Sequence, residues 1–380
     1  MIQSPVSLLI AGGGTGGHLL PGIALAKAIK TLRPEAKITF LVPGKPVDVA
    51  IMKTSGFTWY VNPMRSLPSS WLHLPEFLHL FLRGWAETLK VTRISQPDIV
   101  VGLGGYGSLS AGLLAILSGT PLVTIESNTV AGKVVRWLAN RCAAVYSGGE
   151  VHNIATAKLR ALGIPIRSEL PLDKVAGNRL STVLVMGGSQ GASCLNRVMC
   201  EAAPLLAKLD DSPAIVHLCG KAADEILAVY QKHNIVATVL PFANDMASLY
   251  RQADLVVSRA GGSTLAELTA IGLPAILVPF AQSAEQHQLQ NALQMKAHGA
   301  ALVIAESELT AERLVGTIVQ LSNDRTRLQQ LAIQAKKLGK PNAASAIAHD
   351  ILSMANLQCQ QRIGTRGNQR ITPSVEAEEL

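Results

Sequence analysis

The sequence is poor in cysteine and aromatic residues, and it lacks long hydrophobic runs. Its five cysteines are an odd number without the paired spacing of a metal site, so we expect free thiols in a reducing compartment. No apolar run reaches about 18 residues, so no membrane-spanning helix is expected. The N-terminus has no basic region, and its first apolar run ends in glycines, so no signal peptide is expected either.

Charge is also scarce, at 16% of the residues, and it is biased toward the positive with a formal net charge of +8. Such a bias suits nucleic acid, an anionic membrane or an anionic substrate. Basic residues do not alternate with aromatic ones and no nucleic-acid motif occurs, so we expect no nucleic-acid partner. With 380 residues, 48% of them apolar, the chain is long enough for two globular domains.

Glycine, by contrast, is plentiful, and its first cluster organises the chain. A strand predicted over residues 6–11 runs into Gly12–His18 (GGGTGGH), and an apolar helical face follows. A strand, a glycine turn and a helix N-terminus together suit a phosphate or another polar acceptor. The spacing also fits a dinucleotide fingerprint, but Asp48 comes too late after the second predicted strand, so a nicotinamide cofactor is the weaker hypothesis.

His18 stands at the end of this loop, where it is either a base or a structural residue. Strand and helix patterns alternate through the first 150 residues, which predicts an α/β fold with a parallel sheet. Segments 104–108 and 126–128 each follow a predicted buried strand. Because the carboxyl ends of parallel strands lie at one edge, we expect both segments to lie near residues 12–18.

Residues 57–85 interrupt this alternation and hold seven of the fifteen aromatic residues. A helix predicted from Glu76 onward has one apolar face, for which core packing is the simplest interpretation. Trp71, Leu72 and Leu74 precede it in a segment rich in proline and serine, so contact with an anionic membrane surface is the alternative. The apolar face comprises Phe77, Leu78, Phe81, Leu82, Trp85 and Leu89.

The opening pattern recurs in the second half, after a weakly patterned segment at 163–180. A strand predicted over Thr182–Met186 leads into a glycine turn, and a strand over 254–258 leads into a helix carrying Glu267. We therefore expect two similar domains, each with a phosphate-type loop. The predicted divisions are a first domain at 1–165, a second domain at 166–341, a last helix at 342–357 and a disordered tail at 358–380.

Taken in order, these motifs resemble the MurG family of bacterial N-acetylglucosaminyltransferases, over about residues 6–350. The signal is strong because several motifs occur at matching intervals. They are GGGTGGH at 12–18, GGYGS at 104–108, GGSQGA at 187–192, SRAGGSTLAE at 258–267, GLPAILVPF at 272–280 and HQLQNA at 287–292.

The resemblance implies a glycosyltransferase B fold, in which two Rossmann-like domains face a cleft. It implies inverting transfer of N-acetylglucosamine from UDP-N-acetylglucosamine to lipid I, the undecaprenyl-diphosphate-linked muramyl-pentapeptide, giving lipid II for peptidoglycan synthesis. The second domain would hold the donor and the first the acceptor, with the protein peripheral at the cytoplasmic face of the membrane. No Asp-x-Asp pair occurs, so neither a metal nor another cofactor is expected.

The resemblance also implies roles for individual residues. His18 is the candidate base and Glu126 the second candidate. Glu267 would accept both ribose hydroxyls, although a helix-dipole charge is its simpler explanation. Arg167 would lie near the diphosphate, unless it is an ordinary surface arginine, and Ala243 would bind uracil through its main chain. The remaining donor contacts implied are Asn128 and Gln288 to the sugar, Ser189, Gly262, Ser263, Thr264, Leu265 and Ala266 to the phosphates, and Thr15, Gly16 and Gly17 along the cleft.

The departures from the family pattern lie in or beside the first domain. Ile125 and Ser127 replace the first and third residues of His-Glu-Gln-Asn, Ile164 replaces the asparagine of Gly-Asn-Pro, and Leu109-Ser110 replaces Gly-Pro. An acceptor with a different peptide stem or carrier lipid is therefore an open alternative. The alternatives are a non-catalytic membrane adaptor, a UDP-sugar epimerase and a transferase to diacylglycerol. Retention of both His18 and Glu267 favours an enzyme.

Overall fold

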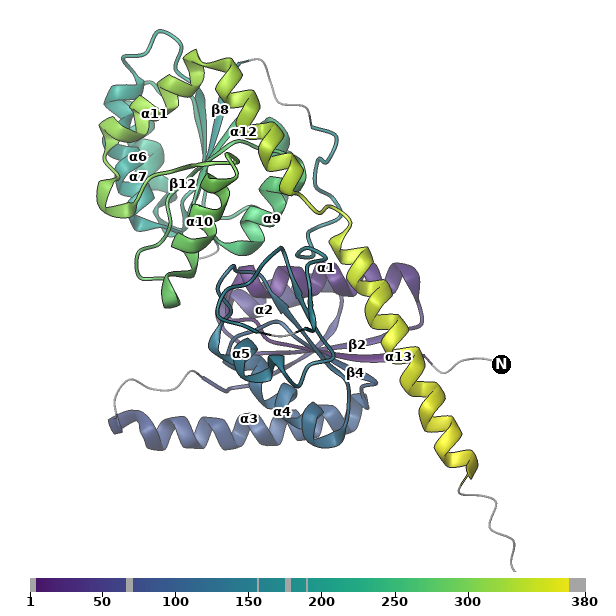
Figure 1. The fold of residues 1–380 in the computed structure, drawn as a ribbon. Helices are drawn as coiled ribbons and strands as arrows, with labels where there is room; N and C mark the ends of the chain where they lie inside the picture. The colour runs from purple at the N-terminus through teal and green to yellow at the C-terminus, as the bar shows by residue number, and fades with distance from the viewer. Residues whose placement is uncertain (1–4, 66–70, 156, 175–178, 189–190, 369–380) are drawn as a thin grey trace, which may run out of the picture.

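Two parallel β-sheets form the centres of two domains, with helices covering each sheet (Figure 1). This computed structural model describes residues 5–65, 71–155, 157–174, 179–188 and 191–368. The first sheet has strand order β3-β2-β1-β4-β5-β6-β7 and the second has order β10-β9-β8-β11-β12-β13. The prediction of an α/β protein with two similar parallel-sheet domains is confirmed.

The first domain contains seven strands and five α-helices among its described residues. The strands are β1 (Ser7–Ala11), β2 (Lys37–Val42), β3 (Thr58–Val61), β4 (Ile99–Gly102), β5 (Leu122–Glu126), β6 (Ala144–Ser147) and β7 (Leu159–Arg160). The helices are α1 (Gly16–Leu32), α2 (Pro46–Ser55), α3 (Leu74–Ser95), α4 (Leu109–Ser118) and α5 (Lys133–Ala139).

The second domain follows the same plan. Its strands are β8 (Thr182–Met186), β9 (Ala214–Leu218), β10 (Ala237–Leu240), β11 (Leu255–Ser258), β12 (Ala275–Leu277) and β13 (Leu302–Val303). Its helices are α6 (Ser193–Leu206), α7 (Ala223–Lys232), α8 (Met246–Gln252), α9 (Gly262–Ile271), α10 (His287–Ala297), α11 (Ala311–Asn323) and α12 (Arg325–Leu338).

Both faces of each sheet are buried, which explains why the strands are apolar runs rather than alternating patterns. In β1, Leu8 and Ile10 belong to the core on one face, and Leu9 and Ala11 belong to the core on the other. The strand order in each domain reverses direction beside its first strand, between β1 and β4 and between β8 and β11. Ligands of open α/β sheets bind at the carboxyl ends of strands at such a reversal. The glycine-rich loops after β1, β4, β8 and β11 all lie there.

The chain returns to the first domain through its last helix, α13 (Ala343–Asn368), which packs on α1 (Figure 1). Ile347 and Ile351 are fully buried there, and the hydroxyl of Tyr146 donates a 2.7 Å hydrogen bond to Asp350. The prediction of a disordered tail from residue 358 is wrong as far as Asn368, and the rest of the tail lies outside the described residues. Extending an existing helix adds a hydrogen bond per residue and needs no apolar face.

Helix α3 lies along the edge of the first domain that faces away from the second (Figure 1). Its apolar face is only partly core, because Leu78 is 54% exposed and Leu82 is 59% exposed. Phe77, Phe81 and Trp85 are half-buried and form a ladder with ring centroids 6.1 and 6.4 Å apart. Core packing alone therefore does not account for this face. Among the described helices, none combines the length and the hydropathy that a membrane span requires.

Candidate functional site

The glycine loop after β1 is held by a buried carboxylate. Gly12, Gly13 and Gly14 all have positive φ, a backbone region that favours glycine. Asp48 is fully buried, and its two oxygens accept hydrogen bonds from the N–H groups of Gly14 (2.7 Å) and Lys45 (3.1 Å). This carboxylate therefore binds the loop itself instead of being available to a dinucleotide ribose, which counts against the nicotinamide hypothesis.

His18 lies in the first turn of α1 with one ring nitrogen fixed. Its Nδ1 is 2.7 Å from the carbonyl oxygen of Leu103, in the loop after β4. A carbonyl can only accept, so Nδ1 must carry the proton, and the neutral ring keeps an unprotonated Nε2. The expected meeting of segments 12–18, 104–108 and 126–128 at one edge is confirmed, since β1, β4 and β5 are neighbours in the sheet.

Glu126 is 3% exposed, and both of its carboxylate oxygens accept hydrogen bonds from the loop that follows it. Oε1 accepts from the main-chain N–H and the side-chain amide of Asn128, at 3.0 and 3.1 Å, and Oε2 accepts from the N–H of Gly132 at 2.9 Å. A carboxylate whose oxygens already accept three hydrogen bonds is poorly placed to reach a substrate. The geometry therefore favours His18 over Glu126 as a base.

In the second domain, Glu267 is a buried acceptor on α9, at 6% exposed. Its Oε1 accepts from Nε of Arg167 at 2.8 Å, and its Oε2 accepts from the hydroxyl of Tyr250 at 2.9 Å. Burial raises the pKa of Tyr250, so this hydroxyl stays a donor. Glu267 lies beyond the first turn of α9, so it is not a helix-dipole charge, and Arg167 is not an ordinary surface residue.

The two domains touch at the N-termini of α1 and α9. A Cβ atom added to Gly17 would lie 3.4 Å from the hydroxyl oxygen of Ser263. A Cβ atom added to Gly262 would lie only 1.9 Å from the carbonyl oxygen of Ser127. At this junction, therefore, Gly262 must be glycine for the backbones to come so close.

Asn291 joins the domains at the same place, and it was not among the site residues predicted from the sequence. Its Oδ1 accepts from the N–H and the hydroxyl of Thr129, at 2.9 and 3.0 Å. Its Nδ2 donates to Asn128 Oδ1 at 3.0 Å and to the carbonyl of Ala260 at 2.9 Å. Asn291 is 2% exposed; three of its four contacts are buried, and the one to Asn128 is partly buried. The HQLQNA motif contained the signal, because it includes this asparagine.

A second contact between the domains is the bidentate ion pair of Arg136, on α5, with Glu285, at 2.8 Å for both bonds. Asn153 approaches the same carboxylate at 3.5 Å. Glu285 and Gln286 both have left-handed backbone conformations, with φ of 51° and 54°, which is unusual for two successive residues other than glycine. The ion pair therefore holds a strained segment immediately before α10.

Gln288 and Ala243 are two more of the predicted donor residues. Gln288, at the start of α10, accepts from the N–H of Phe280 at 3.0 Å, which leaves its amide NH2 group as a donor. Arg259 braces the same segment, with its guanidinium 5.2 Å from the ring centroid of Phe280 and a 2.6 Å ion pair to Glu306. Ala243 follows β10, at the carboxyl edge of the second sheet. Ser189 lies outside the described residues.

Helix α1 begins at Gly16, and Thr15 is its N-cap. The first turns of α9 contain four of the predicted phosphate contacts, Ser263, Thr264, Leu265 and Ala266. Both helix N-termini therefore lie at the junction, and that of α9 begins at Gly262. Within the described residues, His, Cys, Asp and Glu side chains form no cluster of three or more that could bind a metal.

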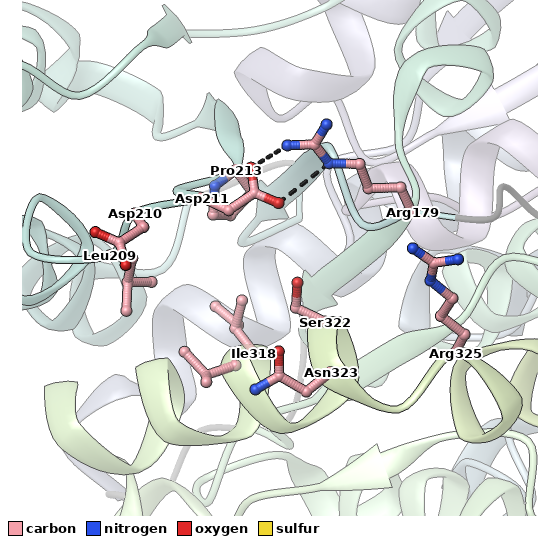
Figure 2. Close-up of a pocket in the computed structure, with 10 residues that line it drawn as sticks. Arg179, Leu209, Asp210, Asp211, Pro213, Ile318, Ser322, Asn323 and Arg325 are labelled. Carbon is pink, nitrogen blue, oxygen red and sulfur yellow. Dashed lines mark hydrogen bonds and ion pairs between the residues drawn. The ribbon is translucent and has the colours of Figure 1, made fainter.

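A pocket of about 380 Å³ lies elsewhere, at the amino ends of β8 and β9. Figure 2 shows Arg179 paired with Asp211 on one side of it and Arg325 at the start of α12 on the other. The glycine loops and His18 lie at the carboxyl edges of the sheets. This pocket is therefore not part of the site at the domain junction.

Comparison with known proteins places this chain in a family. The glycosyltransferase family 28 N-terminal domain matches residues 8–147, and the C-terminal domain of the same family matches residues 182–347. A Myxococcus xanthus protein is 36% identical over 98% of each chain, and an Azoarcus protein is 36% identical over 90% of this chain and 96% of its own. Both are named UDP-N-acetylglucosamine--N-acetylmuramyl-(pentapeptide) pyrophosphoryl-undecaprenol N-acetylglucosamine transferase.

Solved structures agree with this result. The crystal structure of Acinetobacter baumannii MurG is similar with a TM-score of 0.72 and 27% identity, over 92% of this chain and all of the other. A putative UDP-N-acetylglucosamine 2-epimerase from Listeria monocytogenes has a TM-score of 0.65 over 92% of this chain and 96% of its own, but only 15% identity. The second likeness shows a shared fold and no more.

Replacing Gly262 with alanine tests the contact between the domains. The added methyl group would overlap the carbonyl of Ser127, so we expect the domains to separate there and stability to fall by about 1–3 kcal/mol. Small-angle X-ray scattering and thermal melting measure the two effects. Gly316→Ala, in an exposed turn of α11 with open space around the new methyl group, is the control and should stabilise by about 0.5–1 kcal/mol. Wild-type scattering and melting in Gly262→Ala would mean that the contact is absent in solution.

Proposed function

The chain belongs to glycosyltransferase family 28, and we propose that it transfers N-acetylglucosamine from UDP-N-acetylglucosamine to lipid I, giving lipid II for peptidoglycan. The activity named for relatives that match 90–98% of the chain supports this. The observation that carries this proposal is the hydrogen bond that fixes the ring of His18. Its Nδ1–H is held by Leu103, which leaves Nε2 as a base at the junction of the two domains.

The reaction is a single inverting displacement at the anomeric carbon of the donor sugar. Nε2 of His18 takes the proton from the acceptor hydroxyl while the hydroxyl oxygen forms its bond to that carbon. The bond from the anomeric carbon to the phosphate oxygen breaks on the opposite face, and UDP leaves with the electron pair. The resulting imidazolium keeps its Nδ1–H bond to the Leu103 carbonyl.

The charge that develops on UDP needs cationic or N–H partners. We expect the N-terminus of α9, at Gly262–Thr264, to supply N–H groups and a partial positive charge. Arg167 now pairs with Glu267. When the ribose hydroxyls donate to Glu267 in its place, Arg167 is released toward the diphosphate. Donor binding would thus replace Arg167 by the ribose hydroxyls at Glu267. Arg167 would gain the diphosphate as its new partner, so neither charge would be left unpaired.

The remaining residues position the substrates. Glu126 orients Asn128 toward the sugar through two hydrogen bonds, and we assign it a positioning role rather than that of base. Gln288 presents its amide NH2 group to the same sugar, and Ala243 offers its main chain to uracil. Ser189 and the first turn of α9 bind the phosphates in this proposal.

A transfer assay tests the function directly. Labelled UDP-N-acetylglucosamine and a short-chain lipid I analogue are incubated with the purified protein, with and without chelator. We expect a β-linked product whose rate of formation is unaffected by chelator. Donor binding without transfer would instead indicate a different acceptor or a non-catalytic adaptor. Conversion of the UDP-sugar alone would indicate an epimerase.

His18→Ala removes the proposed base. We expect turnover to fall about 100-fold or more, while the dissociation constant for UDP-N-acetylglucosamine stays within about twofold. Single-turnover kinetics and calorimetry measure the two quantities. His298→Ala, which removes an exposed histidine at the end of α10, is the control. Normal turnover in His18→Ala would exclude His18 from the chemistry.

We also propose that the protein docks peripherally on the anionic cytoplasmic face of the membrane, through α3 and the turn before it. Leu72 is 67% exposed and Leu74 is 53% exposed, and Leu78 continues the row on the next turn. Exposed leucines in a row, on a chain with a net charge of +8, are typical of a monotopic contact with an anionic surface.

Replacing Leu72, Leu74 and Leu78 together with serine should weaken sedimentation with anionic vesicles by about tenfold or more. The melting temperature should change little, because all three side chains already face solvent. Val236→Ser, at a 75% exposed site in the second domain, is the matched control and should keep full vesicle binding. An unfolded triple variant would show that this row is core, and unchanged sedimentation would place the membrane contact elsewhere.

A further inference from the structure

An apolar pocket of about 290 Å³ lies beside α3, in the first domain. The side chains that line it are aromatic or aliphatic except for Arg65. That guanidinium pairs with Glu76 at 3.0 Å, and both side chains are more than half exposed, so their charges face solvent. The other lining residues are Met64, Phe77, Phe81, Tyr106, Leu109 and Trp137.

The pocket adjoins the catalytic loop. Tyr106 belongs to the glycine-rich loop after β4, and Leu109 begins the helix that follows this loop. The same loop accepts the hydrogen bond of His18 through Leu103, and a Cβ atom added to Gly104 would lie 3.4 Å from the imidazole. One short loop thus separates the proposed base from the apolar pocket. A ligand with a polar group at His18 and a hydrocarbon chain next to it could occupy both.

We infer that this pocket binds the first isoprene units of the acceptor's polyprenyl chain, an inference that rests on the function proposed above. The acceptor in the relatives' names is a pyrophosphoryl-undecaprenol, in which the diphosphate is joined directly to a branched hydrocarbon. Branched, unsaturated units suit a wall of aromatic rings and a methionine. At about 290 Å³ the pocket is at the small end of ligand sites, so it holds a few units and not the whole chain.

The rest of the chain has an exit along the same helix. Phe77 and Phe81 line the pocket, whereas Leu78 and Leu82 lie on the adjoining, exposed part of the α3 surface. The hydrocarbon therefore passes from the pocket directly to the leucines that we assign to the membrane. Helix α3 serves both tasks, with one part of its surface toward the acceptor and another toward the bilayer.

The test compares two lipid I analogues in solution without detergent or vesicles. They share the diphosphate, sugar and peptide, but one carries a ten-carbon prenyl chain and the other a methyl group. We expect the wild-type KM for the prenyl analogue to be at least about tenfold lower, because its chain leaves water. Trp137→Ala should reduce this KM ratio about fivefold or more. Trp137 is already 52% exposed, so its loss should not unfold the domain.

Leu117→Ala is the matched control, since it removes a 74% exposed apolar side chain from α4, outside the pocket lining, and should keep the ratio. Phe81→Ala is the second pocket variant, for the case that Trp137→Ala melts early. A wild-type protein with no preference for the prenyl analogue would overturn the inference. So would an unchanged ratio in the folded pocket variants.

Binding without turnover separates this inference from the proposed function. Calorimetric titration with a ten-carbon prenyl diphosphate should give tighter binding than inorganic diphosphate, and Trp137→Ala should abolish the difference. If both calorimetric results are obtained but no lipid I analogue receives the sugar, the proposed function is wrong and the assignment of the pocket to a prenyl chain is supported. Equal affinity for a straight saturated ten-carbon diphosphate would indicate a non-specific hydrocarbon site and contradict the assignment.

Discussion

Hydrogen bonding by buried carboxylates fixes the loops on which this site depends. A glycine loop can approach a ligand closely but has few side chains with which to hold its own shape. Asp48 binds the main chain of the first loop, Glu126 binds Asn128 and Gly132, and Glu267 binds Arg167 and Tyr250. Each is 6% exposed or less, so an unpaired charge there would be costly. These hydrogen bonds therefore tie the loops to the buried parts of the two domains.

Most of the fold could be predicted from the sequence, because long strands buried on both faces are apolar runs that end in glycine. The predicted strand Thr182–Met186 matches β8 at both ends. Two strands that the alternation did not reveal are short or half-exposed: β7 has two residues, and β10 lies at the edge of its sheet. The last helix was predicted too short because backbone hydrogen bonding, rather than an apolar pattern, extends it.

Residues of the candidate site could be predicted from the sequence only where a recognisable motif contains them. His18 and Glu267 follow glycine turns, and their neighbours in the chain identify them. Asn291 lies within the HQLQNA motif, but its partner Thr129 is far away in the sequence, so the motif alone does not show what it binds. Tyr250 lies in none of the motifs and is identified only by its hydrogen bond to Glu267. Glu126 was a candidate base because a sequence cannot show that both carboxylate oxygens are already occupied.

The seven-residue helix α5 has a consequence for how the parts of the protein communicate. Its N-cap Gly132 donates to Glu126, Arg136 reaches the second domain through Glu285, and Trp137 lines the apolar pocket. A helix of this length is a rigid rod about 10 Å long. A hydrocarbon bound against Trp137 would therefore contact the same short helix that carries an ion pair between the two domains.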